Sequence, residues 1–110
     1  QKGTSKVKVE IKNICIAKIE FGIVRIYSDT GMVGFFPGTL SQLNTLLPNH
    51  LFFQVTRDAI IHRDIIKSIA SSSFGKIEVM ISDKKREPSV YTVSRPKAAA
   101  FRKWYNSIST

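Results

Sequence analysis

Short runs of β-branched and other apolar residues, each about as long as one strand and separated by turn residues, most constrain the fold of this chain. These runs lie at residues 14–19, 23–27, 32–36, 52–55, 59–61, 77–81 and 90–93. Their length, and the alternation of apolar with polar residues in several of them, are typical of strands in a sheet. The sequence therefore predicts a mainly-β domain. The alternation of charged and apolar residues from Lys6 to Lys12 predicts one further, half-buried strand.

Turn signals indicate how neighbouring strands connect. Asp29-Thr30-Gly31 is typical of a tight turn, so the strand at 32–36 is expected to run antiparallel to the strand at 23–27. The charged stretch 82–87 is expected at the tip of a hairpin that joins the last two strands.

Two helices are predicted. Thr39 can cap a short helix that Pro48 ends. The apolar face of this helix would consist of Leu40, Leu43 and Leu47. Pro96 suits the first turn of a final helix, where its missing N–H is not needed. The apolar face of the final helix would consist of Phe101, Trp104, Tyr105 and Ile108.

The length of 110 residues suits one domain with a modest core. The first five residues lack an initiator Met and have the composition of a linker. We therefore expect a linker remnant at 1–5 and a single folded domain at 6–110, cut from a longer protein.

The charge balance points to a polyanionic partner. Seventeen Lys and Arg face eight Asp and Glu, which gives a net charge of +9. From residue 88 onward there are four basic side chains and no acidic one, so the C-terminal part is the expected electrostatic footprint. A nucleic acid is the first hypothesis.

The residues of catalytic and metal sites are missing from the sequence. The single cysteine, Cys15, excludes an internal disulfide, and neither His50 nor His62 has further ligands at metal-binding spacing. No nucleophile and base are paired, so we expect no enzyme activity, no cofactor and no small-molecule substrate. No apolar run is long enough to span a bilayer. The expected location is the cytoplasm, although a full-length protein could be tethered to a membrane.

Two arginines stand at the ends of apolar, strand-like runs. Arg57 lies within the segment Phe52–His62, and Arg95 follows Val93-Ser94 directly before Pro96. An arginine held at a rigid strand end can direct its planar set of donors at a guanine edge or a phosphate.

The segment Phe52–His62 resembles the central motif of the LytTR-type DNA-binding domain of bacterial transcription regulators. In that family an aromatic residue precedes a stretch close to Arg-Val-His-Arg-Ser-Tyr-Ile-Val-Asn, and isoleucine follows. The matching residues here are Phe53, Val55, Arg57, Ile60-Ile61, Ile66 and Ile69. The second family mark, Val-Ser-Arg before the last helix, is Val93-Ser94-Arg95. The spacing of Ile14 to Tyr27 also fits, and the resemblance runs from about Val9 to Tyr105.

The resemblance implies about ten short strands in three antiparallel sheets with two short helices, and loops that enter successive major grooves of double-stranded DNA. Three segments would contact bases: residues 18–23, the segment around Arg57 and the turn at Arg95. The residues implied to contact base edges are Arg57, Arg95 and Lys18. Those implied to contact the DNA backbone are Arg25, Gln54, Tyr91, Ser94 and Lys97, together with the first N–H groups of the last helix. Further candidates for DNA contact are Thr56, Asp58 and His62.

Several of these residues have a purely structural alternative. Arg57 could pair with Asp58 or Asp64, and Arg95 could cap the last helix. Arg25 could belong to the solvated face of a strand, and Tyr91 could pack across strands. His62 could be a surface group at the end of a strand, and the pair Phe35-Phe36 is expected in the core.

The expected function is sequence-specific binding of double-stranded DNA by the output domain of a bacterial regulator, such as a two-component response regulator. The full-length protein would bind direct or inverted repeats as a dimer. Thr56, Asp58, Ala59 and His62 stand where the family has His, Ser, Tyr and Asn. These departures motivate one alternative, a protein-interaction or membrane-associated module with weakened DNA binding. A second alternative is a single-stranded nucleic-acid binder.

Overall fold

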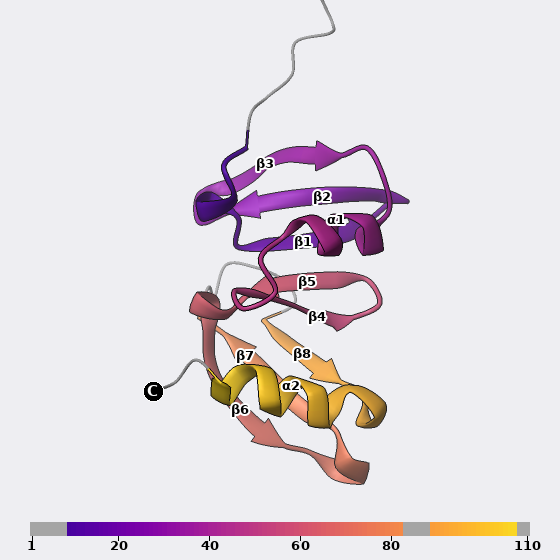
Figure 1. The fold of residues 1–110 in the computed structure, drawn as a ribbon, viewed down its shortest axis with the longest axis vertical. Coiled ribbons are helices and arrows are strands. Elements are labelled where there is room, and N and C mark those ends of the chain that lie inside the picture. The colour runs from indigo at the N-terminus through magenta and orange to yellow at the C-terminus, as the bar shows by residue number, and fades with distance from the viewer. Residues whose placement is uncertain (1–8, 83–88, 108–110) are drawn as a thin grey trace, which may run out of the picture.

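The computed structural model describes residues 9–82 and 89–107 (Figure 1). Within these ranges the fold is mainly β, as the sequence predicts, with two antiparallel sheets and two α-helices. Neither α-helix in the described ranges is long and apolar enough to cross a membrane.

The first sheet has five strands in the order β3-β2-β1-β5-β4. The strands are β1 (Ile16–Glu20), β2 (Ile23–Ser28), β3 (Gly31–Phe36), β4 (Phe52–Thr56) and β5 (Ala59–His62). Every neighbouring pair is antiparallel, including β2 and β3 on either side of the predicted turn. The pairing of β1 with β5 joins the first three strands to the β4–β5 hairpin, which carries the Arg57 motif.

The second sheet has three strands in the order β6-β7-β8. They are β6 (Ile66–Ser71), β7 (Ile77–Ile81) and β8 (Val90–Val93), and both pairs are antiparallel. Three single turns of 3-10 helix complete the fold: η1 (Ile11–Asn13), η2 (Arg63–Ile65) and η3 (Ser73–Gly75).

Both helices lie where the sequence predicts them. In α1 (Leu40–Leu46) the Thr39 side chain accepts from the Gln42 N–H, and the Gln42 side chain accepts from the Thr39 N–H. This reciprocal capping box satisfies two backbone donors at the start of the helix. The second helix, α2 (Arg95–Ser107), buries Phe101 completely, and Trp104 and Tyr105 pack around the same core. Ile108, expected on that face, lies outside the described residues.

The apolar residues form two cores on opposite faces of the five-stranded sheet. One lies among β5, the second sheet and α2, and its central residues include Ile61, Val79 and Phe101. The other lies under α1 and includes Leu43 and Ile60. Adjacent residues of β5 thus point into different cores, because successive side chains of a strand face opposite sides.

The described residues form eight strands in two sheets, so the expected total of about ten strands in three sheets is not confirmed. A second expectation about the strands is wrong for the described residues. The strand expected at 6–12 is not formed from Val9 onward, because the backbone turns back on itself. The Asn13 N–H donates to the Glu10 carbonyl, and the Ile14 N–H donates to the Ile11 carbonyl. Residues 6–8 and most of the expected hairpin tip at 82–87 lie outside the described ranges.

Besides the connection from β3 to α1, further connections lie at one edge of the molecule, at the right in Figure 1. They are the β1–β2 turn, the β4–β5 turn, the start of α2 and the η3 connection between β6 and β7. We call this edge the turn edge.

Candidate nucleic-acid interface

The β4–β5 turn presents Arg57 at the centre of the turn edge. The Gln54 side chain donates to the Arg57 carbonyl over 3.3 Å, and the Asp58 N–H donates to the Thr56 hydroxyl over 3.2 Å. The Ile19 N–H of β1 donates to the Asp58 carbonyl over 2.9 Å. The backbone of the turn is therefore held on both sides, while the Arg57 side chain is exposed.

The alternative role of Arg57, an ion pair with a neighbouring aspartate, is not observed. Among the described residues, no carboxylate lies within 4.0 Å of the Arg57 guanidinium. Arg63 likewise does not pair with Asp64. Its guanidinium donates to the Tyr105 carbonyl over 3.0 Å and lies over the Tyr105 ring. Within the described part, neither of these arginines is therefore paired with the aspartate next to it in the sequence.

A groove joins the two arginine motifs, although about forty residues separate them in the sequence. It has a volume of about 370 Å³ and is lined by Val55, Thr56, Arg57, Thr92, Ser94 and Lys97. The Lys97 ammonium group donates to the Gln54 carbonyl over 3.1 Å, which ties the first turn of α2 to β4. Four of the predicted contact residues therefore line a single concave surface.

Arg95 begins α2 next to this groove and is exposed. Its side chain crosses the η3 connection. A Cβ atom added to Gly75 would lie 3.1 Å from the Arg95 Cγ. The aliphatic part of the Arg95 side chain thus packs against the backbone of Gly75. The Lys97 N–H already donates to the Ser94 carbonyl over 3.0 Å, so it is not one of the N–H groups at the start of α2 that remain available to a DNA phosphate.

Lys18 lies in strand β1 and not in a loop. The loop expected at 18–23 is a two-residue turn, Phe21-Gly22, and both residues have positive φ, 53° and 76°. The Lys18 side chain is 11% exposed, lies 3.3 Å from the Glu20 carboxylate and is positioned over the Tyr27 ring. The expected base contact from Lys18 would need this side chain to leave its ionic and aromatic neighbours.

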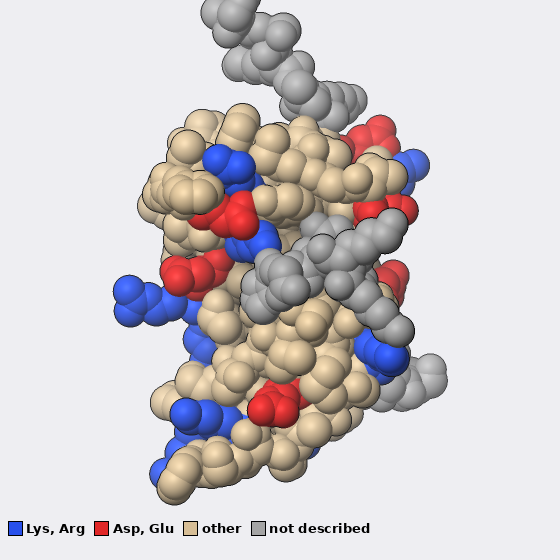
Figure 2. Space-filling model, turned by 180° about the vertical axis from the view of Figure 1, so that it is seen from behind, with Lys and Arg blue, Asp and Glu red and all other residues tan. Residues whose placement is uncertain are grey.

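Glu20 organises a charged and aromatic cluster beside the β1–β2 turn. It accepts from the Tyr27 hydroxyl and contacts Lys18 and Arg25. The Tyr27 hydrogen bond and the two cations hold the pKa of Glu20 below its usual value, and the same hydrogen bond raises the pKa of Tyr27. Figure 2 shows the charged side chains on this surface. Along the turn edge, at the left in that view, acidic side chains lie among the basic ones.

Arg25 lies between two exposed aromatic rings, so it is more than the solvated face of a strand. Its guanidinium carbon is 5.5 Å from the centre of the Phe21 ring and 5.7 Å from that of Phe35. Phe21 is 90% exposed and Phe35 is 55% exposed. The expectation that Phe35 is a core residue is therefore wrong. The neighbouring Phe36 packs against the core, since adjacent residues of β3 face opposite sides.

Besides Lys18, two predicted contact residues are buried. Tyr91 is 6% exposed and belongs to the core between the sheets, so packing across strands is the role that the structure gives it. His62 is 9% exposed, so the alternative of a surface group at a strand end is wrong. Its Nδ1 accepts from the Asp64 N–H over 2.9 Å, and its ring meets that of Phe52 edge-on. Burial lowers the pKa of His62 and favours the neutral ring.

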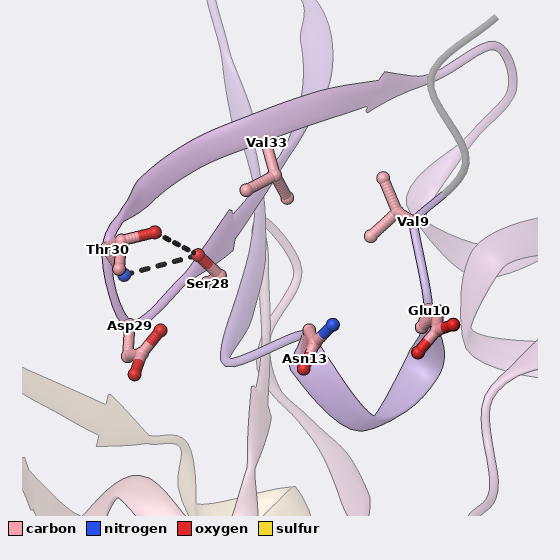
Figure 3. Close-up of a pocket in the computed structure, with 7 residues that line it drawn as sticks. All are labelled: Val9, Glu10, Asn13, Ser28, Asp29, Thr30 and Val33. Carbon is pink, nitrogen blue, oxygen red and sulfur yellow. Dashed lines mark hydrogen bonds between the residues drawn. The ribbon is translucent and has the colours of Figure 1, made fainter.

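A second concave region lies away from the turn edge. It has a volume of about 590 Å³ and is lined by Val9, Glu10, Asn13, Ser28, Asp29, Thr30 and Val33 (Figure 3). Its charged side chains are the carboxylates of Glu10 and Asp29, and the Ser28 hydroxyl is hydrogen-bonded to Thr30. Carboxylates repel phosphates, so this region does not belong to the candidate nucleic-acid interface.

The sequence-based search did not select Phe21, Thr92 or Phe74 as site residues. Thr92 lines the groove. Phe21 and Phe74 are exposed, and both adopt positive φ directly before a glycine with positive φ. The Phe-Gly dipeptides at the two turns were the available signal, because a large apolar residue is unusual in a tight turn.

Comparison with known proteins gives the family of this domain. Residues 4–106 match the family model of the LytTr DNA-binding domain, so the chain belongs to the LytTR family. This is a family of DNA-binding domains and not of enzymes. Among solved structures, the fold is similar to the LytTr DNA-binding domain of a protein from Bacillus cereus named as a methyl-accepting/DNA response regulator. The two share 18% identity with a TM-score of 0.75, over 96% of this chain and 93% of the other. No curated protein gives a match.

Proposed function

We propose that this domain binds double-stranded DNA sequence-specifically through the turn edge. The groove that unites Arg57 with Ser94 and Lys97 carries the proposal, because it brings the two arginine motifs of the sequence onto one surface. In this arrangement the β1–β2 turn, the β4–β5 turn and the start of α2 follow one line along the duplex and enter successive major grooves.

Arg57 and Arg95 are the residues proposed to contact base edges. Arg57 is exposed in the turn that follows β4, and Arg95 is exposed in the first turn of α2, so each guanidinium can reach a base without loss of core contacts. An arginine that contacts guanine through two hydrogen bonds contributes about 1–3 kcal/mol of discrimination between bases. Lys18, Tyr91 and His62 are not included, because they are buried. They support the interface from within the fold.

Contacts with the DNA backbone are proposed for the polar residues around the groove. Thr56, Ser94 and Lys97 line it, and Gln54 shapes the turn through its hydrogen bond to the Arg57 carbonyl. Asp58 is exposed beside Arg57 and would repel a phosphate, so it is proposed to face a cytosine amino group. Arg25 would approach the DNA backbone from β2, beside the β1–β2 turn.

The test is selection of binding sites from a randomised duplex library by the purified domain. The Arg57→Ala/Arg95→Ala variant is selected in parallel. The matched control is Lys12→Ala/Lys67→Ala, which also removes two positive charges. Lys12 and Lys67 are exposed, in η1 and near the start of β6, away from the turn edge. We expect the wild type and the control to enrich one common motif and the arginine variant to enrich none.

Equal enrichment by all three proteins would refute the assignment of Arg57 and Arg95. Retention of weak, salt-sensitive binding by the arginine variant, with loss of the motif, is the expected outcome for residues that contact bases. A basic surface away from the bases still releases counterions from the phosphates.

Single-stranded nucleic acid is a second candidate, favoured by one observation. Phe21 and Phe35 are exposed on either side of Arg25, and exposed aromatic rings beside a cation are the usual platform for unpaired bases. Competition between duplex and single-stranded probes distinguishes the candidates. If single strands compete better and Phe35→Ala removes that advantage, the double-stranded proposal is wrong.

The wider setting is also a proposal. The similar Bacillus cereus domain comes from a protein named as a response regulator, which supports a role here as the output domain of a bacterial transcription regulator in the cytoplasm. Binding to direct or inverted repeats as a dimer would then come from the full-length protein. For the alternative, a protein-interaction or membrane-associated module, the affinity for DNA should be nearly independent of salt, whereas phosphate contacts give a steep dependence.

A further inference from the structure

The η3 connection between β6 and β7 exposes a phenylalanine that the core does not use. Phe74 is 82% exposed and belongs to neither apolar core. Its backbone is left-handed, with φ 59° and ψ 32°. A bulky residue in this region is a genuine outlier, and such strain persists where the surrounding structure fixes it, often at a binding site.

Hydrogen bonds fix the conformation of this connection. The Ser72 N–H donates to the Lys76 carbonyl over 2.8 Å, and the Lys76 N–H donates to the Ser73 carbonyl over 3.3 Å. The Arg102 guanidinium donates to the Ser71 hydroxyl over 2.7 Å and so anchors the end of β6 to α2. The Phe74 ring is therefore presented from a rigid turn.

Three cations lie beside this turn, and Glu78, exposed two residues after Lys76, is the acidic residue nearest to it in the sequence. The Arg95 side chain lies against Gly75, with its Cγ 3.1 Å from the position that a Cβ would take. Lys76 is exposed directly after the turn, and Arg102 lies at its base. An exposed apolar ring among three cations suits a partner that offers negative charge and a small apolar group together. The major groove offers both, since the phosphates border it and the thymine methyl group projects into it.

We propose that the η3 connection is a fourth DNA-contacting segment, in which the Phe74 ring packs on a thymine methyl group and Lys76 contacts a phosphate. This inference rests on the proposed function, because Arg95 brings the neighbouring part of the turn edge to the same groove. It extends the footprint beyond the three segments implied by the sequence and predicts a thymine next to the base that Arg95 contacts.

The test uses the binding site obtained by selection with the whole domain. Each thymine of that site is replaced in turn by deoxyuridine, which removes only the methyl group. Affinities are measured for the wild type, Phe74→Ala and the control Leu46→Ala. Leu46 is 63% exposed in α1, so the control also removes an exposed apolar side chain, and it lies away from η3. Circular dichroism melting verifies that each variant is folded.

At one thymine we expect deoxyuridine to weaken binding by the wild type and by Leu46→Ala about fourfold, the factor that corresponds to burial of one methyl group. Phe74→Ala should be weaker by a similar factor on the thymine duplex and insensitive to the replacement. If every methyl effect is the same for the wild type and Phe74→Ala, the inference is wrong while the proposed function stands. If the wild type selects no duplex motif at all, both are wrong.

Discussion

Replacing Glu20 by glutamine should destabilise the fold, because Glu20 is the anion shared by Lys18, Arg25 and Tyr27. The Lys18 side chain is 11% exposed and the Glu20 side chain 29% exposed. Loss of a hydrogen bond to a charged group costs about 1.5–3 kcal/mol, and partial exposure of Glu20 places the cost at the lower end. We expect a loss of about 1.5 kcal/mol, which corresponds to a fall in Tm of about 6 °C for a domain of this size.

The measurement is thermal unfolding at pH 7, repeated in the Lys18→Met background. If the carboxylate and the ammonium act as a pair, Glu20→Gln should cost much less once Lys18 is gone. The pH dependence gives an independent check. The folded-state pKa of Glu20 is lowered, so its stabilisation is present above the ordinary pKa of 4.5 and is lost as the pH falls through the folded-state pKa. A Tm for Glu20→Gln equal to that of the wild type at pH 7 would refute this reasoning.

The remaining predictions concern the core and the turn edge. Protonation of His62 would break its hydrogen bond from the Asp64 N–H, and its folded-state pKa is lowered, so stability should fall as the pH drops below about 6.5; His62→Asn, which keeps an acceptor, should flatten that part of the stability profile in urea titrations. Phe101→Ala should cost about 3–5 kcal/mol in chemical denaturation, because the ring is fully buried. Gly75→Ala should lower both Tm and DNA affinity, because the added Cβ meets the Arg95 side chain and φ is 76°; an unchanged affinity would show that the position of Arg95 is unimportant.

Much of the fold could be predicted from local sequence patterns. The turn at 29–31, the capped helix after Thr39 and the final helix after Pro96 are all formed as predicted. Each depends on residues close together in the sequence, such as Thr39 and Gln42, which form the capping box. Local signals of this kind are reliable because their partners lie within one turn of chain.

The errors arise where the outcome depends on distant partners. The alternation from Lys6 to Lys12 is compatible with a strand, but a strand needs a neighbouring edge, and the described part of this segment forms the η1 turn instead. Phe35 was expected in the core because it is aromatic. Its exposure follows from the open face of β3, which no helix covers within the described residues. The expectation of three sheets came from the family resemblance and is not confirmed by the described residues, which form two.

For the candidate site, the sequence indicated which residues could contact DNA, but not which of their side chains are buried. The groove could not be predicted from spacing, because it depends on the packing of β8 and α2 against β4. Burial of Lys18, Tyr91 and His62 likewise depends on the second sheet and on cross-strand neighbours. Whether Arg57 and Arg95 contact bases stays a prediction.

In the first sheet, the strands supply residues to both cores, whereas the turns carry residues that belong to neither core. Strands β1 and β5 form a common wall of both cores, and a slip of one residue in their pairing would exchange Ile60 with its neighbours between the cores. The register that positions the turn edge is therefore strongly specified by burial on both faces of the sheet. Phe21, Arg57 and Phe74 belong to neither core. Substitutions at these turns can thus change the surface that the domain presents while the packing of both cores is kept.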